Sequence, residues 1–300
     1  MPVIEDSEFE DKVVVVTGAG GGLGRSHAIE FAKRGAKVLV NDLGGAVDGT
    51  GSGSTAAAVV EEIKAIGGIA IANGDSVADE AGASKIIQDA VDAFGTVDIL
   101  VNNAGILRDK TFKKMSMDDF DLVMQVHMLG TAYVTHAVWP IMYDKHYGRI
   151  VCTSSGSGIY GNFGQSNYGA AKMAMLGFMN VLALEGAGHN VRINCLAPGA
   201  ATRMTATVPG RSQDLSDPDP SRGPQLVSPA VLFMCSEDAP NGVTINAAGG
   251  NFSRAQVYVN DGVTLGVDAS YEALAEVADE LLDMAGAHPR VRRQPVKPPT

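Results

Sequence analysis

The stretch formed by residues 13–25, VVVVTGAGGGLGR, decides the fold of this chain. An unbroken run of valines is typical of a short strand that is buried on both faces of a parallel sheet. The glycines that follow permit a close approach of the backbone to a ligand, and a helical pattern continues as far as Lys33. Free backbone N–H groups and the positive end of a helix dipole attract a pyrophosphate. Strand, glycine loop and helix in this order therefore favour a dinucleotide-binding site over a tight turn without a ligand.

The next predicted strand covers residues 36–40 and leads directly to Asp42. This aspartate lies 18 residues beyond Gly24, where a carboxylate accepts hydrogen bonds from the adenosine ribose 2′-OH and repels a 2′-phosphate. We therefore predict NAD, and not NADP, as the cofactor; a solvated aspartate at a strand end is the alternative interpretation. The glycine-rich residues 43–54 are expected to form a flexible rim of the adenosine site.

Further strand and helix patterns alternate along the chain. This alternation predicts the α/β class, as a single-domain, Rossmann-type, doubly wound parallel sheet with helices on both faces. Ligands bind beyond the carboxyl ends of the strands in such sheets. Polar residues at predicted strand ends are Asp42, Asp75, Asn102 and Ser155.

The domain organisation follows from the same patterns. We expect one cofactor-binding and catalytic domain over residues 1–265, within which residues 205–229 are proline-rich and polar, as in a surface linker or a lid over a substrate. Residues 266–287 carry apolar side chains at helical spacing behind Ser270, which predicts a C-terminal helix that needs a surface to cover. The composition of residues 288–300 is that of a disordered tail.

Composition excludes several classes of protein and site. The chain has 23 basic and 34 acidic residues, a net charge of -11, which argues against a nucleic-acid-binding surface. The acidic residues 1–12 lack the features of a signal peptide, so a cytoplasmic location is expected. The longest uncharged run, residues 150–171, contains too many polar residues for a membrane span. No histidines or cysteines have metal-ligand spacing, so we expect no metal, and Cys152, Cys195 and Cys235 are expected to be reduced core residues.

The chemistry is expected in residues 151–172, VCTSSGSGIYGNFGQSNYGAAK. Tyr168 and Lys172 lie four residues apart, so in a helix they project from one face. A nearby ammonium favours phenolate, and we therefore expect the pKa of Tyr168 to lie below its usual value of about 10, where a general acid-base group works well. A snorkelling lysine on an ordinary helix is the alternative. Ser155, at the end of a strand-like run, favours catalysis because its hydroxyl can hold a carbonyl beside Tyr168.

A family resemblance emerges when these motifs are taken together and in order. The glycine loop, Asn102-Asn103-Ala104-Gly105, Ser155, Tyr168-x-x-x-Lys172 and Pro198-Gly199 resemble the short-chain dehydrogenase/reductase family over residues 9–250. More narrowly, VNDLGG, NNAGILRDKTF and TSSGSGIYGNFGQSNYGAAK are similar to the branch formed by the (3R)-hydroxyacyl-CoA dehydrogenase unit of peroxisomal multifunctional enzyme type 2 and its bacterial stand-alone relatives.

This resemblance implies a role for individual residues. Tyr168 would be the acid-base group, Lys172 its pKa-lowering partner and a ribose ligand, and Ser155 would polarise the substrate oxygen. His127 stands where the family usually has an asparagine that completes a proton relay, so it either relays protons through water or packs. Arg108 is either a contact for a CoA phosphate or a solvated arginine. The implied cofactor contacts, besides Tyr168 and Lys172, are Gly18, Gly22, Leu23, Gly24, Asp42, Asp75, Ser76, Asn102, Ala104, Gly105, Pro198, Gly199 and Thr202.

The implied activity is the NAD-dependent oxidation of a (3R)-3-hydroxyacyl-CoA to a 3-ketoacyl-CoA in a β-oxidation-type pathway, by a homodimer or homotetramer. A 17-hydroxysteroid dehydrogenase and a 3-ketoacyl reductase are alternatives within the family, and Asp42 weighs against a reductase that needs NADPH. A non-catalytic dinucleotide-binding scaffold is the alternative from another class, although it would need neither Ser155, Tyr168 nor Lys172. The chain has no Gly-x-Ser-x-Gly elbow, which argues against a serine hydrolase.

Overall fold

The computed structural model describes residues 7–201 and 219–289. By its internal contacts the chain divides into two compact units, one ending at Arg254 and one beginning at Ala255, which we describe separately. Thr202 and residues 205–218 of the predicted lid lie outside the described residues.

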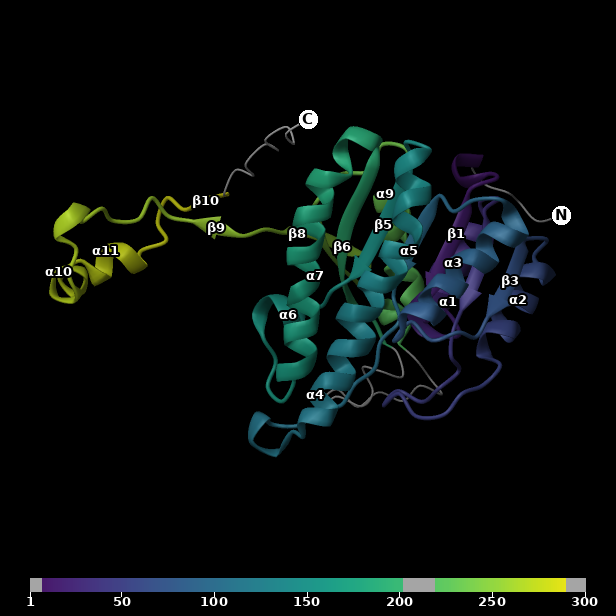
Figure 1. Cartoon of the computed structure of the whole chain (residues 1–300), viewed down its shortest axis with the longest axis horizontal. Helices are drawn as coiled ribbons and strands as arrows, with labels where there is room; N and C mark the ends of the chain where they lie inside the picture. Colours follow the sequence, from purple (N-terminus) through teal and green to yellow (C-terminus); the bar gives the residue numbers. More distant parts are fainter. Residues whose placement is uncertain (1–6, 202–218, 290–300) are drawn as a thin grey trace. The chain divides into compact units, whose positions relative to one another are not determined.

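The first unit is built on an eight-stranded sheet with the strand order β3-β2-β1-β4-β5-β6-β7-β8 (Figure 1). The strands are β1 (Val13–Thr17), β2 (Lys37–Asn41), β3 (Ile69–Asn73), β4 (Ile99–Asn102), β5 (Gly148–Thr153), β6 (Val191–Gly199), β7 (Thr244–Ala248) and β8 (Asn251–Ala255). The pairings from β3 to β7 are all parallel. Only two glycines separate β7 from β8, and both have positive φ angles, which is the backbone of a tight hairpin turn. The predicted doubly wound α/β sheet is confirmed.

Strand β1 is buried on both of its faces, as its run of valines predicts. Val14 and Val16 belong to the apolar cluster on one face of the sheet, and Val13 and Val15 belong to the cluster on the other face. The direction of strand order reverses beside β1, because β2 and β4 pair with its two edges. Such a switch point opens a crevice at the carboxyl ends of the strands, which is where ligands bind in these folds.

Helices cover both faces of this sheet (Figure 1). One layer consists of α1 (Gly22–Ala32), α2 (Thr55–Ala65) and α9 (Ser228–Cys235), and the other of α3 (Glu80–Phe94), α5 (Gly130–Asp144) and α7 (Ser166–Glu185). Two further helices, α4 (Met117–Met124) and α6 (Gly156–Tyr160), lie in the connections that precede α5 and α7. No helix among the described residues is long and apolar enough to cross a membrane. Cys152, Cys195 and Cys235 are buried and unpaired, as expected.

The described end of the predicted lid runs from exposed residues into the core. Residues 219–227 form two short 3-10 turns, and they end at Val227, whose side chain is fully buried. Ser228 follows at the start of α9 and hydrogen-bonds to the buried His27 of α1. Val227 and Ser228 are therefore buried beside α1, whereas residues 219–222 at the start of this described part are exposed.

The second unit contains a small two-stranded pairing of β9 (Tyr258–Val259) with β10 (His288–Pro289), so the predicted tail begins in a strand. Ser270 caps the following helix as predicted, since its hydroxyl accepts a hydrogen bond from the backbone N–H of Ala273. A single helix over residues 266–287 is wrong, however. The helix breaks at Val277 into α10 (Tyr271–Glu276) and α11 (Ala278–Leu282). No described side chain of this unit is buried, so the packing that sustains most protein helices is missing here, and a β-branched residue marks the break.

Candidate active site

A cavity of about 370 Å³ opens at the carboxyl ends of the central strands. It brings together twelve of the predicted site residues. These lining residues are Gly18, Gly22, Leu23, Asp42, Asp75, Ser76, Ala104, Gly105, His127, Tyr168, Lys172 and Pro198. Gly24, Asn102, Ser155 and Gly199 do not line the cavity. The sheet topology thus gathers loops that are up to 180 residues apart in the sequence, from Gly18 to Pro198.

The glycine loop is shaped by contacts that no side chain would permit. Gly18 has a φ of +62°, and a Cβ atom there would lie 2.7 Å from the Cα of Ala104. A Cβ atom on Gly24 would lie 2.4 Å from the carbonyl oxygen of Gly18. Gly24 therefore packs the first turn of α1 against the loop and supports the cavity wall, although it does not line the cavity itself.

Replacement of Gly18 by alanine is expected to cost about 1–3 kcal/mol through backbone strain and to weaken dinucleotide binding, because the loop must move away from Ala104. Gly177 provides a matched control, since it lies inside α7 and a Cβ atom there would meet no neighbouring atom within 4 Å. Gly177→Ala should stabilise the protein by about 0.5–1 kcal/mol. Thermal unfolding and NADH fluorescence titration check both variants, and equal NADH affinities would contradict the assigned role of Gly18.

Asn103, and not Asn102, ties the end of β4 to the glycine loop. Its side-chain nitrogen donates to the carbonyl oxygens of Thr17 and Gly18, at 3.1 and 2.9 Å. The hydroxyl of Thr17 accepts hydrogen bonds from the backbone N–H groups of Asn103 and Ala104, both at 3.1 Å. Asn102 is buried and donates to the hydroxyl of Thr135 at 3.0 Å, so it anchors α5. In the sequence, only its place beside Asn102 in the same motif indicates that Asn103 could have a role at the site.

Asp42 is fixed at the rim of the cavity by three hydrogen bonds. One carboxylate oxygen accepts from the backbone N–H of Gly20 at 2.8 Å, and the other accepts from the N–H of Gly44 at 2.6 Å and from the hydroxyl of Thr55 at 3.2 Å. The carboxylate thereby connects the glycine loop with the loop that follows β2. Residues of this second loop line the cavity, in agreement with the predicted rim.

The residues present fit a dinucleotide. A cradle formed by Gly18, Gly21 and Gly22 lies at the N-terminus of α1, where free N–H groups favour a pyrophosphate. Asp42 and Asp75 follow the neighbouring strands β2 and β3, and both line the cavity with carboxylates of the kind that ribose hydroxyls and an adenine amino group require. No group of three or more metal-ligating side chains exists in the described ranges.

Tyr168 and Lys172 lie one turn apart in α7, both buried in the cavity wall. The ammonium of Lys172 is 5.5 Å from the centroid of the Tyr168 ring, and it donates to the carbonyl oxygen of Thr153 at 2.6 Å. Ser155 lies at the N-terminus of α6, where its hydroxyl accepts from the N–H of Ser157 at 3.1 Å, and it lies near enough to Tyr168 to lower the pKa of the phenol. Of the four predicted catalytic residues, Tyr168, Lys172 and His127 thus line the cavity, and Ser155 lies beside Tyr168 without lining it.

The predicted lowering of the Tyr168 pKa is wrong for this structure. Burial raises the pKa of the phenol to about 12, and the neighbouring Ser155 only partly opposes this effect. Lys172 does not compensate, because its ammonium is directed at Thr153, and burial lowers the pKa of Lys172 itself to about 8. The protein thus holds Tyr168 as a neutral phenol beside an amine that is easily deprotonated.

His127 is a buried residue of the cavity wall. It lies in a short π-helical turn, Gln125–Leu129, and its Nε2 is within 3.0 Å of the backbone nitrogen and 2.8 Å of the carbonyl oxygen of Ile106. Its ring meets that of Tyr168 edge-on at 5.2 Å, and only a glycine at position 105 leaves room for it. Burial lowers the pKa of His127 well below its usual range, so the ring is neutral at physiological pH. Packing is observed, whereas the relay remains a prediction.

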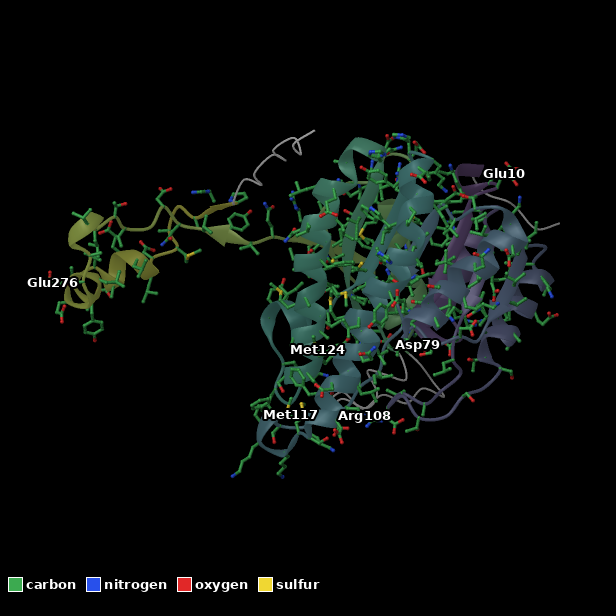
Figure 2. The ribbon with its side chains drawn as sticks, in the orientation of Figure 1. Glu10, Asp79, Arg108, Met117, Met124 and Glu276 are labelled. Carbon is green, nitrogen blue, oxygen red and sulfur yellow. The ribbon has the colours of Figure 1, made fainter. Side chains whose placement is uncertain are left out.

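Arg108 is already paired and does not offer a free guanidinium to a phosphate. It binds the carboxylate of Asp119 in α4 at 2.9 Å and the carbonyl oxygen of Asp48 at 2.9 Å. Lys110 binds the second oxygen of Asp119, also at 2.9 Å. Figure 2 shows Arg108 beside α4, whose first and last residues, Met117 and Met124, are labelled.

Comparison with known sequences agrees with this geometry. The family model described as short chain dehydrogenase matches residues 12–213. A Mycobacterium tuberculosis protein named as a short-chain type dehydrogenase/reductase is 49% identical over 282 residues, which cover 93% of this chain and 96% of that protein. The peroxisomal multifunctional enzyme type 2 of Mus musculus is 53% identical over 230 residues, which cover 76% of this chain but 30% of that enzyme.

Solved structures show the same similarity. A short chain dehydrogenase from Mycobacterium avium superposes with a TM-score of 0.80 at 39% identity, over 95% of this chain and 98% of that one. A 7α-hydroxysteroid dehydrogenase in complex with NADH and 7-oxo glycochenodeoxycholic acid superposes with a TM-score of 0.71 at 30% identity, over 82% of this chain and 96% of that one. With its glycine loop, its Tyr168–Lys172 pair and these relatives, this chain is an oxidoreductase that belongs to the short-chain dehydrogenase family.

Proposed function

We propose that this enzyme interconverts a secondary alcohol and a ketone with NAD as its cofactor, and that its substrate is a (3R)-3-hydroxyacyl-CoA. The observation that carries the proposal is the arrangement of one cavity, which has Tyr168 and Lys172 in one part of its wall and the anchored carboxylate of Asp42 in another. A scaffold that only binds a dinucleotide would not need Tyr168 and Lys172. The NADH-bound hydroxysteroid dehydrogenase supports a nicotinamide dinucleotide as the cofactor.

The choice of NAD follows from Asp42. Its carboxylate lies at the cavity rim, held by Gly20 on one side and by Gly44 on the other. A fixed negative charge at this place accepts hydrogen bonds from a ribose diol and repels a 2′-phosphate. A reductase that depends on NADPH is therefore a poor match for this cavity.

The chain's own side chains handle the proton of the reaction. When bound, the nicotinamide ring supplies the hydride chemistry. Ser155 orients the substrate oxygen through its hydroxyl, while Tyr168 takes the hydroxyl proton during oxidation and returns it during reduction. Lys172, one turn beyond Tyr168 in α7, would bind a ribose hydroxyl of the dinucleotide through its amine. Because the phenol is buried, the surrounding wall excludes water and strengthens each of these interactions.

The thioester substrate is supported by sequence similarity. The mouse multifunctional enzyme shares half of its aligned residues with this chain, but the match covers 30% of that enzyme, so its remaining activities do not transfer. The hydroxysteroid dehydrogenase structure favours a steroid as the second candidate. We also propose a homodimer or homotetramer, which sedimentation equilibrium measures directly.

A substrate panel tests the proposal. The purified protein is mixed with NAD and, separately, with a straight-chain (3R)-hydroxyacyl-CoA, its (3S) isomer and a 17-hydroxysteroid, and NADH absorbance is followed. We expect turnover of the (3R) thioester alone. Turnover of the steroid alone would show that the substrate is a steroid and not an acyl-CoA. A lack of turnover across the panel, with NAD still bound, would favour a non-catalytic dinucleotide-binding scaffold.

A further inference from the structure

The rim loop, residues 43–54, joins two parts of the cavity wall that lie far apart in the sequence. It begins directly after Asp42, whose carboxylate accepts a hydrogen bond from the N–H of Gly44 at 2.6 Å. Its middle contacts residues 106–108, which follow β4. The residues of the rim loop that line the cavity are Leu43, Gly45, Ala46, Val47 and Gly49.

Two hydrogen bonds hold the middle of the rim loop against residues 106–108. The backbone N–H of Leu107 donates to the carbonyl oxygen of Val47 at 2.9 Å. The Nε of Arg108 donates to the carbonyl oxygen of Asp48, also at 2.9 Å. The second bond has a charged donor, and such hydrogen bonds are stronger than those between neutral groups. The rim loop is therefore fastened at its middle as well as at its root.

The rim loop itself is loosely built. None of residues 43–54 is buried. Gly49 has a φ of +87°, and a Cβ atom there would lie 3.2 Å from the side chain of Ile106, so the backbone of the loop rests against that side chain. Segments with few buried side chains open at a small cost in free energy. The contacts with residues 106–108 thus decide whether the loop covers this side of the cavity.

Residues 106–108, in contrast, are attached to the helices of the site. Asn167 is fully buried, precedes Tyr168 in α7, and donates from its side-chain amide to the carbonyl oxygen of Arg108 at 3.1 Å. The Nη1 of Arg108 binds the carboxylate of Asp119 in α4 at 2.9 Å. Arg108 is therefore fixed through its backbone and through one end of its guanidinium, while its Nε is directed at the rim loop.

We propose that Arg108 is a positioning residue that latches the rim loop over the cavity, and that a nicotinamide dinucleotide enters and leaves when this latch opens. Both partners in the latch are protein groups, so it forms in the free and in the cofactor-bound protein. The latch therefore controls the rates of binding and release more than the affinity. This assignment rests on the proposed function for the dinucleotide in this cavity, but not for the substrate.

Stopped-flow mixing of the full chain with NADH, followed by fluorescence, measures the association and dissociation rate constants. Arg108→Ala removes the donor to the carbonyl of Asp48. We expect both rate constants to rise by about tenfold, as for the loss of one hydrogen bond from a charged donor. Kd should change little, because the latch is lost equally from the free and the bound protein.

Lys110→Ala is the matched control. The ammonium of Lys110 binds the other carboxylate oxygen of Asp119 at 2.9 Å, and its side chain is half exposed. This variant therefore removes a cation from the same ion-pair cluster but leaves the hydrogen bonds of the rim loop in place. Both rate constants should remain those of the wild type.

Hydrogen exchange gives a second readout that needs no cofactor. The N–H of Leu107 is protected by its bond to Val47, so its exchange reports opening of the rim loop. Arg108→Ala should speed this exchange by about tenfold, in proportion to the lost hydrogen bond. Lys110→Ala should leave the exchange rate of Leu107 unchanged.

Unchanged NADH rate constants in Arg108→Ala, at a thermal stability equal to that of the wild type, would overturn the latch and leave the proposed function intact. A rise in the dissociation rate constant alone would also overturn it, because the guanidinium would then act on the dinucleotide directly. A wild type that binds no NADH would instead overturn the proposed function, and the latch with it.

Discussion

Tyr168→Phe is expected to lower kcat by about 10²–10⁴-fold, because it removes the hydroxyl that we propose exchanges a proton with the substrate oxygen. The ring itself remains, so its edge-on contact with His127 at 5.2 Å is retained and the cavity wall keeps its shape. Affinity for NADH should therefore change little. Steady-state kinetics combined with a fluorescence titration of NADH measures both quantities on the same protein.

The nearby Tyr160 offers the same substitution outside the cavity. It is 71% exposed at the end of α6, and its phenylalanine variant should keep full activity. A Tyr168→Phe enzyme that turned over at the rate of Tyr160→Phe would remove Tyr168 from the mechanism. A loss of NADH binding together with the loss of kcat would show a structural defect.

Removal of the Asp42 charge should lower the preference for NAD over NADP by about 10- to 100-fold, or about 1.4–2.8 kcal/mol. Two variants separate the contribution of the negative charge of Asp42 from that of its hydrogen bonds. Asp42→Asn keeps an acceptor oxygen for the N–H groups of Gly20 and Gly44, whereas Asp42→Ala leaves both without their partner. We expect Asp42→Asn to weaken the preference for NAD with little change in stability. Asp42→Ala should weaken the preference for NAD and also lower Tm.

The ratio of kcat/KM for NAD to that for NADP is the measurement. Asp48→Asn is a suitable control, because this aspartate lies in the same rim loop, is exposed, and does not line the cavity. A preference that survives in both Asp42 variants would undo the assignment of NAD.

The parts of the molecule that the sequence predicts correctly depend on local patterns. The valines of β1 are buried on both faces, and the glycine loop, Asp42 and the Tyr168–Lys172 pair meet at one cavity because each follows a strand or shares a helix face. Periodicity and strand order determine these positions. Ser270 was likewise correct as a cap, since capping involves only a few consecutive residues.

The parts that the sequence does not predict depend on tertiary surroundings. The pKa of Tyr168 rises because the side chain is buried away from water. The ammonium of Lys172 donates to the carbonyl oxygen of Thr153, which lies 19 residues away in the sequence. The sequence could not show which of the adjacent asparagines, Asn102 or Asn103, binds the glycine loop; in the structure it is the side chain of Asn103. The helix predicted over 266–287 is broken into α10 and α11 in the structure. The apolar periodicity of the sequence could not show this, because it does not reveal whether a surface is present for the apolar side of the helix to cover.

The most direct test of the central claim follows a single atom. A (3R)-3-hydroxyacyl-CoA with deuterium on carbon 3 is incubated with the enzyme and NAD, and the reduced cofactor is analysed by mass spectrometry. Our account predicts one deuterium per reduced cofactor, formed together with one equivalent of 3-ketoacyl-CoA, and almost no product with Tyr168→Phe. Reduced cofactor without deuterium, or equal yields from both proteins, would contradict it.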